Sequence, residues 1–165
     1  MILLSDANVL IDLEYVGAIQ HLPLIAPVEV LDVVLEECID DRQPLLVEHV
    51  KAAGITVVPL EREWIVPARQ FNRYGDLSSQ DCLNLFYAQQ YNRILVAGDL
   101  WVRKSCAKEG IDCRGTIWIV EELFSQKLVP ASLLLMWIGK WPLFRRRLPA
   151  KELARLEKLL KTDKQ

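Results

Sequence analysis

The stretch MILLSDANVLIDL, residues 1–13, decides the fold that we predict for this chain. Residues 2–4 are all apolar, as in a strand that is buried on both faces of a parallel sheet. From Ala7 onward the apolar residues follow a helical period, which predicts a helix over residues 7–20. Asp6 therefore lies where a buried strand passes into a helix, and ligands of open α/β sheets bind at this carboxyl end of a strand. Its carboxylate has two interpretations, as the N-cap of the helix or as a metal-binding or catalytic group.

Short apolar strands and helices alternate along the rest of the chain. We predict further strands over residues 28–31, 55–58, 94–97 and 111–113, and helices over residues 32–39, 43–53, 60–74 with a kink at Pro67, 78–91, 100–109 and 117–128. Two more helices, over 130–141 and 149–161, would form a C-terminal extension. The prediction is a three-layer α/β/α fold around a mostly parallel sheet of four or five strands. Residues 1–128 would form this domain, and residues 129–165 a helical extension with a basic tail that packs on it.

Asp99 repeats the arrangement of Asp6, because it follows the apolar run 94–97 and precedes a helix. Glu37 falls on the apolar rows of its predicted helix, so we expect it to face the core, whereas Glu36 falls on the solvated face. A carboxylate that faces the core is costly unless it is paired or coordinated.

Asp81 also has two interpretations. It stands three residues after Ser78, which suits a capping box. It also heads an apolar row with Leu85 and Ala88, which should face the sheet.

Four acidic residues are thus singled out by their positions: Asp6, Glu37, Asp81 and Asp99. If the strands 2–4 and 94–97 are neighbours, all four converge on the crevice between them. Carboxylates packed together repel, so they need protons or a cation to coexist. Oxygen ligands alone favour Mg²⁺ or Mn²⁺, and such a site can activate water to attack a phosphodiester. The set of four predicts a metal-dependent hydrolase of phosphodiesters.

Four segments in this order resemble the motifs of PIN domains, the nuclease fold that includes VapC-type toxins. They are SDANVLI (5–11), VLEEC (34–38), LSSQD (77–81) and ILVAGD (94–99). In the second motif the family's acid precedes an apolar residue, which favours Glu37 over Glu36. The stretch GDLWVRK (98–104) is similar to a bacterial subgroup with a longer C-terminal part. One position departs from the family, because Ala97 stands where a Thr or Ser is frequent, and Asn8 or the backbone would have to take over that role.

The resemblance implies a metal-dependent endoribonuclease in which Asp6, Glu37, Asp81 and Asp99 are catalytic and bind Mg²⁺ or Mn²⁺. We expect Asn8, Ser79 and Arg103 to support this site or to contact the substrate. The resemblance also implies an RNA substrate, a homodimer and a small antitoxin protein as the partner of a toxin. Two alternatives remain open: a non-catalytic RNA-binding or scaffold domain, and a nuclease that acts on DNA.

The charges are distributed unevenly along the chain. Residues 140–165 contain nine Lys or Arg against three Asp or Glu, a net charge of +6, which leaves −8 on the first 139 residues. Arg145, Arg146 and Arg147 follow the aromatic segment WPLF, residues 141–144. Guanidinium groups bind phosphates and stack on bases, so these three arginines are candidates for binding nucleic acid. The alternative is that the aromatic side chains belong to the core and the arginines to a solvated surface.

The four cysteines, residues 38, 82, 106 and 113, form no Cys-x-x-Cys pair, so we expect buried free thiols and no zinc site. The longest apolar run, residues 133–139, is too short to cross a membrane. No signal peptide is evident at the N-terminus. We therefore expect a cytoplasmic protein that does not associate with membranes.

Overall fold

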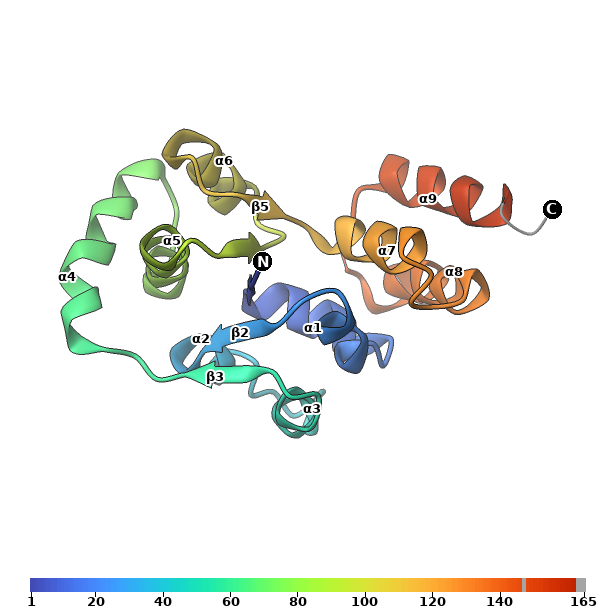
Figure 1. Cartoon of the computed structure of the whole chain (residues 1–165), viewed down its shortest axis with the longest axis horizontal. Coiled ribbons are helices and arrows are strands. Elements are labelled where there is room, and N and C mark those ends of the chain that lie inside the picture. Colours follow the sequence, from blue (N-terminus) through green and yellow to red (C-terminus); the bar gives the residue numbers. More distant parts are fainter. Residues whose placement is uncertain (147, 163–165) are drawn as a thin grey trace.

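The computed structural model describes residues 1–146 and 148–162 and contains a five-stranded parallel sheet (Figure 1). The strands are β1 (Leu3–Ser5), β2 (Val28–Leu31), β3 (Thr56–Val58), β4 (Ile94–Val96) and β5 (Cys113–Arg114). Their order in the sheet is β3-β2-β1-β4-β5, and every pairing is parallel. The first strand is central and pairs with β4 through Leu3 and Ile94, so the expectation that these two strands are neighbours is confirmed.

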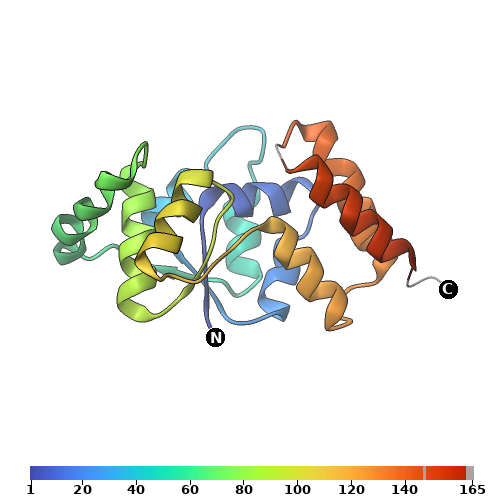
Figure 2. The same ribbon diagram turned by 90° about the horizontal axis from the view of Figure 1, so that it is seen from above.

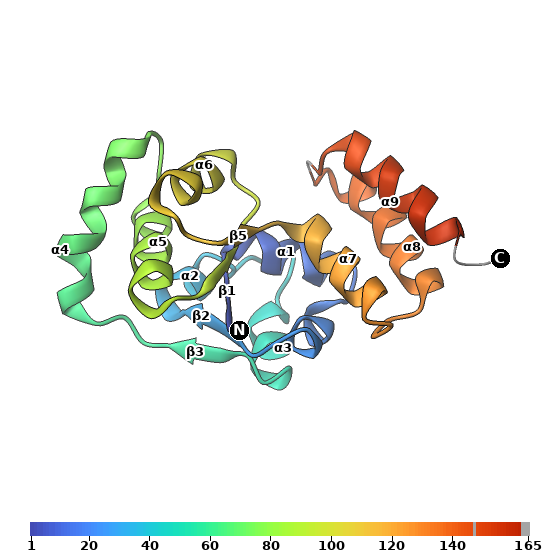
Figure 3. The same ribbon diagram turned by 45° about the horizontal axis from the view of Figure 1, so that its top comes forward.

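Helices cover both faces of this sheet and confirm the predicted three-layer α/β/α fold (Figure 3). From β1 the chain first adds β2 and β3 on one side of the sheet and then β4 and β5 on the other. Because parallel strands are joined by right-handed crossovers, the helices that precede β3 and those that follow it lie on opposite faces. The helices that follow β1 and β2 are α1 (Ala7–Tyr15), α2 (Asp32–Glu36) and α3 (Leu46–Ala52). Those that follow β3 and β4 are α4 (Ile65–Ala68), α5 (Ser79–Tyr91) and α6 (Leu100–Glu109).

Several predicted helices are shorter or more irregular than the apolar period indicated, including α3, which begins at Leu46, and the helix predicted over residues 117–128, which ends at Ser125. The helix predicted over residues 7–20 ends at Tyr15, because Gly17 adopts φ +66° and the chain continues as the 3₁₀ segment η1 (Ile19–Leu24). The second helix, α2, ends at Glu36 rather than at residue 39. In place of one kinked helix over residues 60–74, the structure has α4 between two 3₁₀ segments, η2 (Arg62–Trp64) and η3 (Arg69–Tyr74).

The C-terminal part consists of α7 (Thr116–Ser125), α8 (Ala131–Lys140), the 3₁₀ segment η4 (Trp141–Phe144) and α9 (Ala150–Thr162). The last two helices pack on each other and on α7 at one end of the molecule (Figure 2). Trp137 and Trp141 are fully buried there, whereas Phe144 is exposed, so the alternative that the aromatic side chains of residues 141–144 belong to the core holds for Trp141 and not for Phe144. The indole Nε1 of Trp141 donates a hydrogen bond of 2.7 Å to the backbone oxygen of Asp12, and Phe144 stacks on Tyr15. These contacts attach η4 to α1.

All four cysteines are free, and three of them, Cys38, Cys82 and Cys106, are buried as predicted. Cys113 is partly exposed. Among the described residues, no helix has the length and apolar character needed to span a membrane.

Candidate active site

Asp6 is a buried carboxylate at the carboxyl end of the central strand. Its Oδ1 accepts a hydrogen bond of 2.8 Å from the amide of Val9, which makes Asp6 the N-cap of α1. Its Oδ2 accepts a longer one, 3.4 Å, from the amide of Gly98 beyond the end of β4. Burial, with the negative charges of Asp12 and Asp81, raises the pKa of Asp6 to about 7, although the two amides act to lower it. Asp6 therefore both caps a helix and sits where its negative charge is poorly stabilised.

The expectation that Glu37 faces the core is wrong, because the residue is exposed. It follows the last residue of α2, so the helical rows that placed it inward end before it. Burial and the negative charge of Asp81 nevertheless raise the pKa of Glu37. Glu36 is also exposed.

Asp81 and Asp99 both cap helices. Asp81 forms a capping box with Ser78, in which Ser78 Oγ accepts from the Asp81 amide at 3.0 Å and Asp81 Oδ2 accepts from the Ser78 amide at 2.9 Å. The Oδ1 of Asp99 accepts from the amides of Trp101 and Val102 at 2.8 and 3.0 Å. The positive ends of α5 and α6 therefore stabilise these two carboxylates. Asp81 is half-buried and Asp99 is exposed.

Asp6 and Asp99 thus follow the neighbouring strands β1 and β4, whereas Glu37 follows α2 and Asp81 lies in the first turn of α5. Within residues 1–146 and 148–162, no three His, Cys, Asp or Glu side chains lie close enough together to hold a metal ion. Three of the acids nevertheless interact electrostatically, because the negative charge of Asp81 contributes to raising the pKa of Asp6 and of Glu37. The donor atoms of this set are all carboxylate oxygens, which suit Mg²⁺ or Mn²⁺.

A fifth carboxylate, Asp12, was not among the predicted site residues. It is 5% exposed and accepts a hydrogen bond of 3.0 Å from Thr116 Oγ1. It also forms an ion pair with Arg146, whose Nε donates to Asp12 Oδ1. Burial raises the pKa of Asp12 even though Arg146 and Thr116 both lower it. The available signal was its position on α1 between Val9 and Val16, an apolar row on which a charged residue needs a partner.

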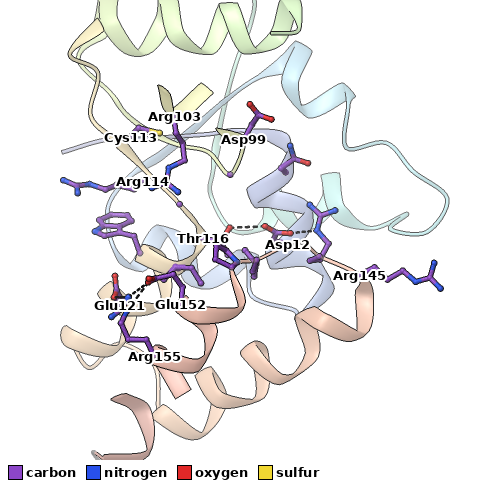
Figure 4. A pocket seen from close by; sticks show the side chains of 18 residues that line it. Asp12, Asp99, Arg103, Cys113, Arg114, Thr116, Glu121, Arg145, Glu152 and Arg155 are labelled. Carbon is purple, nitrogen blue, oxygen red and sulfur yellow. Dashed lines mark hydrogen bonds and ion pairs between the residues drawn. The ribbon is translucent and has the colours of Figure 1, made fainter. Parts of the chain in front are cut away.

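Beside the acids, a groove of about 740 Å³ separates the edge of the sheet from the C-terminal helices (Figure 4). Asn8, Gly98 and Asp99 line the end of it that borders the acids. Five arginines line the rest: Arg103, Arg114, Arg145, Arg146 and Arg155. Figure 4 shows that Arg103 extends from α6 toward the groove, whereas Arg145 points away from it.

Some of the remaining predicted residues line the groove and others do not. Asn8 and Arg103 line the groove together with Asp99, whereas Ser79 is exposed in the first turn of α5 and is not part of the groove wall. Of the three consecutive arginines, Arg145 is exposed and Arg146 is held by Asp12. Arg147 lies outside the described residues. The alternative that these arginines lie on a solvated surface is wrong for Arg146, because the buried carboxylate of Asp12 binds it.

Comparison with known proteins agrees with this architecture. No curated protein is significantly similar to the chain in sequence. The model of the DUF3368 family, described as a PIN domain, matches residues 2–136, which include β1 to β5, all four predicted acids and most of α8. Because this match covers most of the chain and agrees with the parallel sheet and its acidic edge, the chain belongs to the PIN domain family.

Proposed function

We propose that this protein is a metal-dependent endoribonuclease. PIN domains are in general nucleases, and they typically use divalent metal ions. The observation that carries the proposal is the buried Asp6 at the β1–β4 switch point, where burial, with a smaller contribution from the negative charges of Asp12 and Asp81, raises its pKa to about 7. A protein that keeps uncompensated negative charge at this edge of the sheet has a site suited to a cation.

Asp6, Glu37, Asp81 and Asp99 fit Mg²⁺ or Mn²⁺ by the chemistry of their donor atoms. When bound, such an ion would lower the pKa of a coordinated water and neutralise charge on a phosphodiester. The protein contributes a fixed first ligand, because the amides of Val9 and Gly98 hold the Asp6 carboxylate from both sides. Asp81 and Asp99 are held in a similar way by the amides at the starts of α5 and α6.

Hydrolysis by water, without a covalent intermediate, agrees with the positions of the two histidines of the chain. His49 pairs with Glu14, with 2.8 Å between Nδ1 and Oε1. The ring of His21 packs edge to face on Trp137, with 5.2 Å between the ring centres. Among the described residues, neither histidine is hydrogen-bonded to a serine or cysteine, as the base for such a nucleophile would be. A water molecule activated at the acidic edge is the remaining nucleophile that the site supports.

The arginine-lined groove beside Asp99 supports a polyanionic substrate. We infer RNA as the substrate from the resemblance of the four motifs to ribonucleases of this fold. A nuclease that acts on DNA would cleave DNA at the same acids, and a non-catalytic domain would bind RNA without cleaving it. A cleavage assay therefore distinguishes these two alternatives from an endoribonuclease.

The test compares cleavage of labelled single-stranded RNA and DNA of one sequence by the wild type, with Mn²⁺ and with EDTA. We expect cleavage of RNA only, only with metal, and loss of at least 10³-fold in rate for Asp6→Asn, since a buried ligand is replaced. Lys51→Gln, an exposed change on α3, serves as the matched control with normal activity. Cleavage that persists in EDTA or in Asp6→Asn would contradict the proposal, and preferential cleavage of DNA would replace RNA as the substrate.

We also propose that the protein is a homodimeric toxin whose acidic edge is covered by a small antitoxin. The exposed carboxylates of Glu37 and Asp99 would accept a basic segment of such a partner. Light scattering on the purified protein tests the dimer. A short reading frame next to the gene, whose product suppresses cleavage when added, would support the antitoxin, and a gene without such a neighbour would argue against it.

A further inference from the structure

The groove between the sheet edge and the C-terminal helices has a polarised distribution of charge. At the end away from the acids, Arg155 pairs with both Glu121 and Glu152, so its charge is neutralised locally. In the interior, Arg146 pairs with Asp12. The positive charge that remains available must come from the other arginines of the wall.

Arg103 supplies this charge near the acids. It is exposed on α6, one turn after Asp99, and extends toward the groove (Figure 4). Its Nη1 lies 3.8 Å from the position that a Cβ on Gly115 would occupy, so the guanidinium group runs along the groove wall. Among the residues that the structure describes, Arg103 pairs with no carboxylate, whereas Arg114 pairs with Asp112 at 3.0 Å.

An aromatic surface lies in the same groove. Trp118, in the first turns of α7, is only partly buried and lines the wall of the groove beside Arg114. The guanidinium carbon of Arg114 lies 5.9 Å from the centre of the Trp118 ring. A partly exposed indole ring beside guanidinium groups is a combination that binds single-stranded nucleic acids, through base stacking and phosphate contacts.

We propose that this groove holds the single RNA strand that flanks the cleaved phosphodiester, with Arg103 on a backbone phosphate and Trp118 stacked on a base. The identity of the nucleic acid rests on the proposed function. Of the four acids, Asp99 lines the groove beside Asn8 and Gly98, and the Gly98 amide donates to Asp6, so a strand in the groove passes this edge of the acidic site. Its volume of about 740 Å³ suits a few nucleotide units rather than a duplex. An acidic protein segment would use Arg103 but would have no use for the indole face.

The experiment measures binding of a fluorescein-labelled single-stranded oligoribonucleotide by anisotropy in EDTA, so that the result does not depend on cleavage. We expect Arg103→Gln to weaken binding at least tenfold, since a charged hydrogen bond is lost. It should also reduce the slope of log Kd against log salt by about 0.7, the value for one phosphate contact on a single strand. Trp118→Ala should weaken binding about fivefold or more without changing that slope, and Trp118→Phe should restore most of the affinity.

Lys51→Gln removes an equal charge from the exposed surface of α3, outside the groove, and should leave both affinity and slope unchanged. Circular dichroism checks that each variant is folded. Equal binding by Arg103→Gln and Lys51→Gln, or no binding by the wild type, would overturn the inference. The inference would also be overturned if Arg103→Gln weakened the binding of a polyglutamate peptide but not the binding of RNA. The groove would then fit an acidic protein partner. If Arg103 and Trp118 control binding but the wild type cleaves no RNA, the groove assignment stands and the proposed function fails.

Discussion

The carboxylate of Asp12 on α1 binds the guanidinium group of Arg146, 134 residues further along the chain. The side chains are 7% and 25% exposed, so the pair is largely withdrawn from water. Thr116 donates to the other carboxylate oxygen, and the indole of Trp141 donates to the backbone oxygen of the same residue. Asp12 therefore joins α1, α7 and the segment after η4, and these elements form a wall of the groove.

We expect Arg146→Gln to destabilise the protein by about 3 kcal/mol, because it leaves a buried carboxylate without its cation. Arg145→Gln, the exposed neighbour, should change stability by less than about 0.5 kcal/mol. Urea denaturation followed by circular dichroism measures both. The double variant Asp12→Asn/Arg146→Gln should recover part of the loss, since no unpaired charge then remains. Equal stability of the Arg145 and Arg146 variants would show that the ion pair does not support the fold.

Asp6 should make the stability of the metal-free protein depend on pH. The pKa of Asp6 is about 7 when folded against an ordinary value of 3.8, so the folded state binds this proton more tightly than the unfolded state. Its stabilising contribution is complete below about pH 3.8 and is lost as the pH rises through 7. The loss is on the order of 4 kcal/mol for an isolated group.

The corresponding measurement is thermal unfolding in EDTA at pH 5.5 and pH 8.5. Asp6→Asn should raise Tm by roughly 10 °C at pH 8.5 and by about half as much at pH 5.5, because asparagine carries no charge to bury and about half of the loss in the wild type occurs below pH 5.5. Mn²⁺ should raise the Tm of the wild type at pH 8.5 and should have little effect on Asp6→Asn. A lower Tm for Asp6→Asn at pH 8.5 would mean that the two amide hydrogen bonds outweigh the cost of burying the charge.

Asp99 has a structural role that can be separated from its proposed catalytic one. Its Oδ1 caps α6, and asparagine caps helices about as well as aspartate. We expect Asp99→Asn to retain stability within about 0.5 kcal/mol and to lose cleavage, whereas Asp99→Ala should lose cleavage and about 1 kcal/mol of stability. Urea denaturation and the RNA assay with Mn²⁺ measure the two effects. An active Asp99→Asn protein would leave this residue with the capping role alone.

The assignment of the second acid can be tested with two adjacent glutamates. Both Glu36 and Glu37 are exposed, so neither substitution by glutamine should affect folding. The negative charge of Asp81 raises the pKa of Glu37, which connects Glu37 with the other acids. We therefore expect Glu37→Gln to reduce cleavage at least 10²-fold and Glu36→Gln to leave it nearly unchanged. The apparent affinity for Mn²⁺, measured by calorimetry, should fall in the same variant. The opposite order of activities would transfer the role to Glu36.

The fold could be predicted from the sequence because β1 to β4 lie in short runs that are rich in apolar residues, although β2 contains Glu29. The positions of Asp6 and Asp99 also followed from local pattern, since a carboxylate after such a run must lie at the carboxyl end of the sheet. The ends of the helices could not be predicted as well from the sequence. The end of α1 depends on the φ of +66° at Gly17, and the irregular region around α4 depends on how it packs against α5.

Only the tertiary structure decided what surrounds each charge. The sequence by itself placed Glu37 on an apolar row, but α2 ends one residue earlier and the side chain is exposed. Three consecutive arginines look alike in sequence, and Arg146 differs from Arg145 because Asp12 lies opposite it across 134 residues. Hydrophobic periodicity is a local property and survives in the sequence as spacing. The partner of a buried charge is set by packing between distant segments, so no local pattern encodes it.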